Sequence, residues 1–122
     1  MNFLKTITSR LTARGRALAQ VNLGRACANK HESEQAIKHY DNVINLAKPP
    51  RDVLAMALFN RALVYTTIGK EKQATEDLKA VLSMRETMPT IKKSANDKLV
   101  RMQRKRTRDD ASRAAPKPGS QD

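Results

Sequence analysis

Residues 51–82 read RDVLAMALFNRALVYTTIGKEKQATEDLKAVL, and this segment gives the clearest indication of the fold. Its large apolar residues recur three or four positions apart on both sides of Gly69, which is the spacing of one face of an α-helix. Gly69 interrupts the pattern because glycine is a poor helix former. The stretch therefore predicts two helices joined by a short turn.

The chain on both sides of this stretch continues the same organisation. A helix is expected over about 13–30, and another after Ser33, whose hydroxyl can cap it by accepting a bond from a first-turn amide. The proline pair at 49–50 stops that second helix, and Asp52 is the expected cap of the third. A fifth helix is expected after Pro89. The sequence thus predicts an all-α protein of 122 residues.

The composition excludes several protein classes. Aromatic residues make up 3% of the chain and Trp is absent, which argues against an all-β fold. No apolar run approaches the length of a membrane span. Cys27 is the single cysteine, so no internal disulfide can form, and with two histidines a zinc site is not expected.

No enzymatic constellation emerges from the sequence. The four glycines are too far apart to form a phosphate-binding loop. Cys27 and His31 are neighbours on a helix face, but a packed thiol explains the cysteine better than a catalytic pair does. Glu71, Glu76 and Asp77 are expected on a charged surface. We therefore expect no catalytic residue, no metal and no cofactor.

Shifting the sequence by 38 residues superposes similar residues on one another. Small and large side chains recur at matching positions: Ala17 on Ala55, Asn22 on Asn60, Gln35-Ala36 on Gln73-Ala74, Val43 on Val81, and Val53 on Ile91. Small residues suit the close approach of two helices in a hairpin, and large ones suit the contact between hairpins. The shift therefore indicates internal repeats.

The repeated pattern resembles the tetratricopeptide repeat family. In the first repeat, about 17–50, the matching residues are Leu23-Gly24, Ala36, Tyr40 and Pro49. In the second, about 55–88, they are Leu58, Ala62, Tyr65, Gly69, Ala74 and Leu78. Gln20, Cys27 and Arg61 depart from the pattern, and the repeat is four residues longer than the family's 34.

The resemblance implies a domain over 15–103 that stacks two helix-turn-helix repeats, closed by a capping helix over about 90–106. A basic amphipathic helix over 1–14 and a basic, disordered tail over 107–122 are expected on either side. An ordinary helical bundle is the alternative fold.

In the family, the first helices of successive repeats line a groove that binds a peptide or a partner helix. The corresponding peptide-binding residues here are Val21, Asn22, Arg25, Asn29, Met56, Phe59, Asn60, Leu63, Lys98 and Arg101. Some members hold a terminal carboxylate with Lys, Asn, Asn, Lys and Arg; this chain has Val21, Arg25, Asn60, Ser94 and Lys98 there. The resemblance implies a protein-interaction scaffold, and its amide and basic side chains favour an acidic peptide.

The net charge of +12 is concentrated at the two ends of the chain. Residues 1–31 contain six basic residues and no acidic one, whereas residues 32–90 contain eight of each. Such ends attract polyanions, so a nucleic acid or an anionic membrane is an alternative partner. The alternative polyanion-binding residues are Arg101, Arg104, Lys105, Arg106 and Arg108.

Three interpretations of residues 1–14 stay open: a cap on the first repeat, a helix lying on an anionic membrane, and a mitochondrial targeting segment. Phe3, Ile7 and Leu11 lie four apart in this segment. A cytoplasmic location is the leading expectation, with peripheral membrane attachment or mitochondrial targeting as alternatives. Self-association is a further expectation, because it would bury exposed ends of a short array.

Overall fold

The computed structural model describes residues 2–85 and 87–114, except for the side chains of residues 2, 3 and 5–11. This part of the chain forms five helices: α1 (Asn2–Asn29), α2 (Ser33–Ile44), α3 (Arg51–Thr67), α4 (Glu71–Ser83) and α5 (Pro89–Ala114). The predicted all-α class is therefore confirmed.

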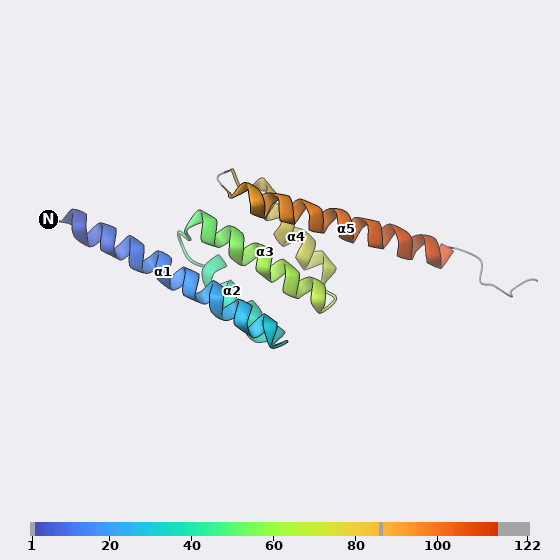
Figure 1. Cartoon of the computed structure of the whole chain (residues 1–122), viewed down its shortest axis with the longest axis horizontal. Coiled ribbons are helices and arrows are strands. Elements are labelled where there is room, and N and C mark those ends of the chain that lie inside the picture. Colours follow the sequence, from blue (N-terminus) through green and yellow to red (C-terminus); the bar gives the residue numbers. More distant parts are fainter. Residues whose placement is uncertain (1, 86, 115–122) are drawn as a thin grey trace, which may run out of the picture.

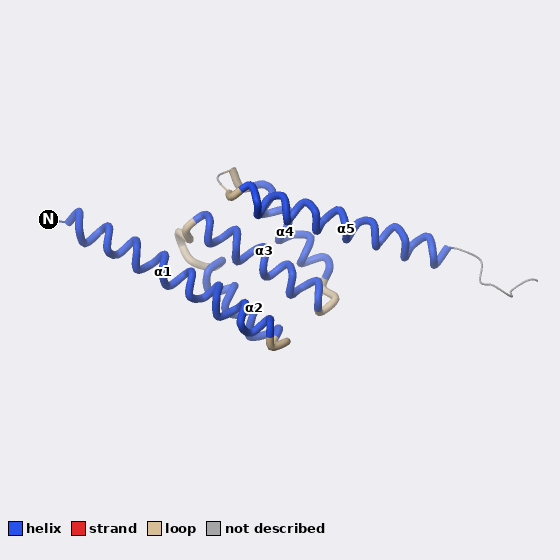
Figure 2. The backbone as a smooth tube through the Cα atoms, in the orientation of Figure 1, coloured by secondary structure: helices blue, strands red, loops and turns tan. Residues whose placement is uncertain are grey.

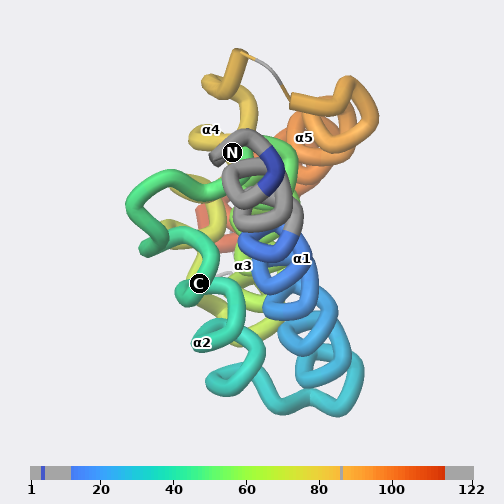
Figure 3. The backbone as a smooth tube through the Cα atoms, turned by 90° about the vertical axis from the view of Figure 1, so that its left-hand side faces the viewer, coloured from blue at the N-terminus to red at the C-terminus, as the bar shows by residue number. Residues whose placement is uncertain are grey.

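The helices form two layers. In Figure 1, α1, α3 and α5 run in the same direction in the nearer layer, with α2 and α4 behind them. Short loops join the helices, as the tube view in Figure 2 shows. Figure 3, turned by 90°, places α2 and α4 on one side of the molecule and α1 and α5 on the other. The helices α1 and α2, and then α3 and α4, thus form two hairpins, and α5 packs on α3 and α4.

The core consists of two apolar clusters that share α3. The first cluster includes Val21, Tyr40 and Val53, and joins α1, α2 and α3. The second includes Leu78 and Ala95, and joins α3, α4 and α5. Because α3 contributes buried side chains to both clusters, the two hairpins and α5 form one continuous stack.

Two turns at equivalent repeat positions end α1 and α3. His31 has φ 63° and Gly69 has φ 80°, so both lie in the left-handed region. The next N–H in each turn donates to a carbonyl five residues back: Glu32 to Cys27 at 2.9 Å, and Lys70 to Tyr65 at 2.8 Å. This is the Schellman arrangement, which satisfies the last carbonyls of a helix. The predicted break at Gly69 is confirmed.

The two predicted N-caps are wrong. Ser33 is already the first residue of α2, the residue before it is Glu32, and no side chain caps the helix. Asp52 lies inside α3, which follows Pro50. Pro50 itself occupies the N-cap position, and it has no side-chain oxygen that could accept a hydrogen bond from the first turn. The carboxylate of Asp52 instead accepts hydrogen bonds from Arg14 of α1, the shorter at 2.6 Å.

The two end helices are longer than predicted. One helix covers 2–29, so its backbone has no boundary near residue 14. The helix α5 continues to Ala114, where a disordered tail from residue 107 was expected. Its last turns project past the other helices in Figure 1. Opposite charges four residues apart, at Lys105 and Asp109 and at Arg106 and Asp110, favour a helix here.

Two expectations about the ends lie outside the described part of the chain. The amphipathic character predicted for residues 1–14 depends on side chains at positions 3, 7 and 11, and the expected tail includes residues 115–122. Within the described helices, none is both long and apolar enough to cross a membrane.

Candidate functional site

The α1–α3–α5 layer carries most of the predicted peptide-binding residues as exposed or half-buried side chains. On α1, Asn22, Arg25 and Asn29 are exposed. On α3, Asn60 is half-buried and Leu63 is 37% exposed. On α5, Lys98 is half-buried and Arg101 is exposed. We call this surface the α1–α3–α5 face.

A cavity of about 290 Å³ lies between α1 and α3 on this face. It brings together four of the predicted residues: Arg25, Asn29, Asn60 and Leu63. The remaining lining residues are Ala28, His31, Ser33, Tyr40, Val64 and Thr67. Its lining includes a guanidinium and several hydrogen-bonding groups but no carboxylate, so its chemistry suits an anion or a hydrogen-bond acceptor.

Three predicted apolar contacts lie elsewhere. Val21, expected at the centre of the groove, is 2% exposed and belongs to the first core cluster. Met56 is half-buried against that same cluster, and Phe59 is half-buried against the second. Helical periodicity selects apolar residues, but it does not distinguish a side that faces a neighbouring helix from one that faces solvent. Val21 therefore contributes to the core and cannot contact a ligand on this face.

The paired asparagines differ in their local bonding. The side-chain amide of Asn60 donates to the Met56 carbonyl at 2.7 Å, within its own helix. The side chain of Asn22 is exposed and makes no hydrogen bond to the described residues. One hydrogen bond of the Asn60 side-chain amide is thus made to its own helix, while its side-chain oxygen can still accept a hydrogen bond from a ligand.

The sequence did not single out Tyr40 as a site residue, yet its side chain lines the cavity. Burial raises the pKa of Tyr40 to about 12, an effect that the charge of Arg25 partly offsets. The phenol is therefore a neutral hydrogen-bond donor at physiological pH. A signal was present in the sequence: Tyr40 is a large aromatic residue that must face the small Gly24 in the hairpin.

The second region of interest is α5. A cavity of about 410 Å³ lies between α4 and α5, lined by Glu71, Lys79, Leu99 and Arg106 among others. The predicted polyanion-binding residues, Arg101, Arg104, Lys105, Arg106 and Arg108, are all exposed and form no ion pair with the described residues. Within the described chain, no group of His, Cys, Asp and Glu could hold a metal ion.

Comparison with known proteins agrees with this geometry. A family model described as tetratricopeptide repeat matches residues 15–87. The chain belongs to the tetratricopeptide repeat family. It is also 39% identical over 67 residues to the tetratricopeptide repeat and J domain-containing co-chaperone DNJ1 of Fusarium oxysporum f. sp. lycopersici. That alignment covers 55% of this chain but 11% of the co-chaperone. No solved structure matches the chain.

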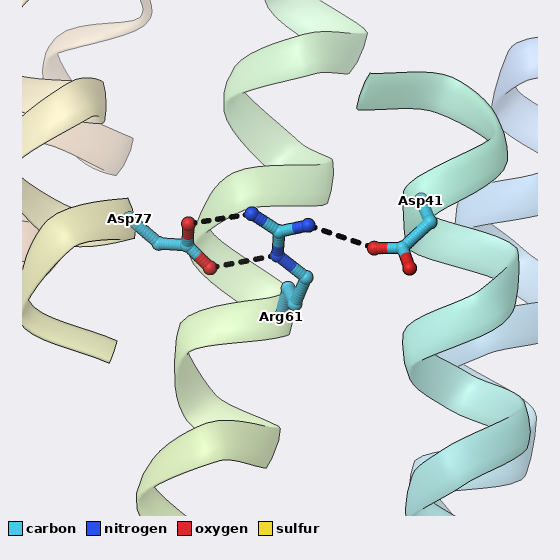
Figure 4. A network of polar contacts seen from close by, with 3 residues as sticks. All are labelled: Asp41, Arg61 and Asp77. Atoms are coloured by element: carbon cyan, nitrogen blue, oxygen red, sulfur yellow. Dashed lines mark hydrogen bonds and ion pairs between the residues drawn. The ribbon is translucent and has the colours of Figure 1, made fainter. Parts of the chain in front are cut away.

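A polar network centred on Arg61 joins the two tetratricopeptide repeats. In the sequence, Arg61 stood out only as a departure from the family pattern. Arg61 of α3 donates two hydrogen bonds to Asp77 of α4, at 2.8 and 2.7 Å, and a third to Asp41 of α2 at 2.7 Å (Figure 4). Its guanidinium also lies 5.4 Å from the centre of the Tyr65 ring. These partners raise the pKa of Arg61 above its ordinary value, the hydrogen bonds to Asp77 most strongly.

This network corrects the expectation that Asp77 lies on a charged surface. Asp77 is 5% exposed, because α4 places it against α3 and its carboxylate is neutralised by Arg61. The guanidinium spans the second helices of both tetratricopeptide repeats, so it fixes α2 and α4 relative to α3. None of the three residues of this network lines the cavity of the α1–α3–α5 face.

Proposed function

We propose that the chain is a non-catalytic protein-interaction module that binds an acidic peptide or partner helix on its α1–α3–α5 face. Tetratricopeptide repeats generally mediate protein–protein interactions, and the similar fungal protein is itself named a co-chaperone. The observation that carries the acidic preference is the cavity between α1 and α3, whose lining contains Arg25 and no carboxylate.

The distribution of paired and unpaired cations supports this proposal. Arg14 and Arg61 are paired with Asp52, Asp41 and Asp77, which removes them as attractive charges for a ligand. Arg25 and Arg101, on the face itself, are exposed and have no ion-pair partner within the described chain. An acidic ligand would gain charge-assisted hydrogen bonds there without displacing an internal carboxylate.

The test is binding of a labelled, C-terminally amidated peptide rich in Glu, compared with the same peptide carrying Gln for Glu. We expect tighter binding of the Glu peptide, and a loss of about tenfold for both Arg25→Gln and Arg101→Gln. The control is Arg16→Gln, because Arg16 lies nine residues before Arg25 and therefore on the opposite side of α1. Equal affinities for the two peptides would count against the proposal.

A second candidate function is polyanion binding by α5. The observation in its favour is that the helix continues to Ala114 and displays the exposed basic residues 101–108 beyond the repeats. We expect a variant with Gln at Arg104, Lys105 and Arg108 to lower the slope of log affinity against log salt by about 0.9 for each lost duplex-DNA phosphate contact. An unchanged slope would exclude α5 as the contact.

A further inference from the structure

The cavity between α1 and α3 contains a polar group that the fold itself does not use. Tyr40 is 1% exposed, and its hydroxyl forms no hydrogen bond with the described residues. Among the described residues, the only fully enclosed side-chain polar atom without a partner is Thr87 Oγ1. The Tyr40 hydroxyl also lacks a partner but is not fully enclosed, and Tyr40 is one of the residues that line the cavity.

The repeat itself shows that packing does not require this hydroxyl. The position equivalent to Tyr40 in the second repeat is Leu78, which is fully buried and wholly apolar. Phenylalanine would fill the same space, so the hydroxyl is not needed for packing. Because no group of the described fold uses it, the hydroxyl is available to a partner from outside the fold.

We infer that the cavity receives a side-chain carboxylate of the bound acidic peptide, with the Tyr40 hydroxyl as hydrogen-bond donor and Arg25 as counter-charge. This inference rests on the proposed function and assigns a specific pocket to it. A volume of about 290 Å³ leaves room for a carboxylate side chain together with water.

The electrostatics of the lining favour an anion. Arg25 carries a permanent positive charge, and Asn29 and Ser33 add further hydrogen-bond donors. The C-terminal ends of α1 and α3 oppose an anion, but Schellman hydrogen bonds already satisfy their last carbonyls. The N-terminal end of α2, at Ser33, lies on the same cavity and favours negative charge.

We assign a side-chain carboxylate and not a chain terminus, because an acidic peptide offers several side-chain carboxylates and a single terminal one. Arg25 on α1 and Arg101 on α5 are both exposed without an ion-pair partner in the described chain, so a peptide that contacts both crosses the face. The amidated Glu peptide described above contains only side-chain carboxylates, and a Gln peptide with a free C-terminus supplies only a terminal one.

The matched variants are Tyr40→Phe and Tyr65→Phe. The first removes the cavity hydroxyl and keeps the ring that packs against Gly24. The second removes the hydroxyl of the other tyrosine, whose ring lies beside Arg61 and outside the cavity. We expect Tyr40→Phe to weaken binding of the amidated Glu peptide about tenfold and to leave binding of the amidated Gln peptide unchanged. Tyr65→Phe should bind the amidated Glu peptide as tightly as wild type does.

Tyrosine fluorescence provides a second measurement that leaves Tyr40 intact. The chain has two tyrosines and no Trp, so in Tyr65→Phe all tyrosine emission comes from Tyr40. A carboxylate that accepts a hydrogen bond from the phenol quenches its emission. We expect the unlabelled, amidated Glu peptide to quench Tyr40, and the amidated Gln peptide to leave its emission unchanged.

The possible outcomes separate this inference from the proposed function. If the Glu peptide binds selectively but neither Tyr40→Phe nor the fluorescence responds, the pocket assignment fails and the proposed function stands. If wild-type protein does not prefer the Glu peptide, the proposed function itself fails. If the response follows the free C-terminus of the Gln peptide, a terminal carboxylate occupies the cavity and the side-chain assignment is overturned.

Discussion

At the scale of single residues, the contact between the two helices of a hairpin is made by a different pair of side chains in each repeat. In the first hairpin Gly24 faces Tyr40, and a Cβ added to Gly24 would lie 2.8 Å from two ring carbons. The equivalent residues in the second hairpin are Ala62 and Leu78, both fully buried. A larger residue on one helix is thus accompanied by a smaller one on the other, so close packing is kept.

This pairing predicts opposite effects for two glycines of the same helix. We expect Gly24→Ala to lower the free energy of unfolding by about 1–3 kcal/mol, because the new methyl group collides with the Tyr40 ring. Gly15→Ala meets no atom within 4 Å and should raise the free energy by about 0.5–1 kcal/mol through helix propensity. Urea denaturation of both variants measures the difference, and equal effects would show that the Tyr40 contact is unimportant.

The pKa of Tyr40 predicts a loss of stability at high pH. Its value is about 12 in the folded protein against an ordinary 10.0, so the unfolded chain releases the proton first. The protonated phenol therefore contributes up to about 2 kcal/mol to the free energy of unfolding. This stabilisation is fully present below pH 10 and is lost as the pH rises towards 12. Denaturant titrations should show a shallower decline for Tyr40→Phe than for wild type; identical declines would contradict the assignment.

At the scale of elements, the hairpins depend on turns that place one residue in the left-handed region. Gly69 adopts that conformation at little cost, whereas His31, at the equivalent position of the first repeat, bears a side chain. The hydrogen-bond pattern is the same in both turns. The residue type therefore changes the stability of the turn without changing its geometry.

The turns predict a reciprocal pair of variants. We expect His31→Gly to raise the free energy of unfolding by about 1 kcal/mol, and Gly69→Ala to lower it by a similar amount, because only glycine avoids the left-handed penalty. Thermal and urea unfolding measure both changes. A destabilised His31→Gly protein would mean that the His31 side chain contributes more than its backbone strain costs.

At the scale of the whole molecule, α3 joins two core clusters and Arg61 spans both repeats. The side chain of Arg61 is 18% exposed and that of Asp77 is 7% exposed, so this ion pair is largely shielded from water. The pair formed by Arg14 and Asp52 is more exposed, at 41% and 36%. The two ion pairs should therefore differ greatly in what their loss costs.

We expect Arg61→Met to lower the free energy of unfolding by about 3 kcal/mol, because it leaves the Asp77 carboxylate buried without a counter-charge. The control Arg14→Met should cost less than about 1 kcal/mol. Replacing Asp77 by Leu in the Arg61→Met protein should recover much of the loss, since no charge then stays buried. Urea denaturation of wild type and these three variants measures the differences, and no recovery in the double variant would point to lost packing instead.

The number of helices, the hairpin repeat and the family resemblance could be predicted from the sequence alone. These follow from apolar spacing, from Gly69 and the prolines, and from a 38-residue repeat, all of which are local or periodic properties. The family resemblance also selected four of the residues that line the α1–α3 cavity, because the family binds its ligands along the first helices of successive repeats.

Which residues of those helices are buried in the core and which are accessible depends on how the helices pack together. This packing buried Val21 and Asp77, placed Tyr40 in the lining of a cavity, and paired Arg61 with carboxylates 16 and 20 residues away. The physical reason is that helical periodicity fixes the direction of a side chain relative to its own helix. What that side chain meets depends on how separate helices pack.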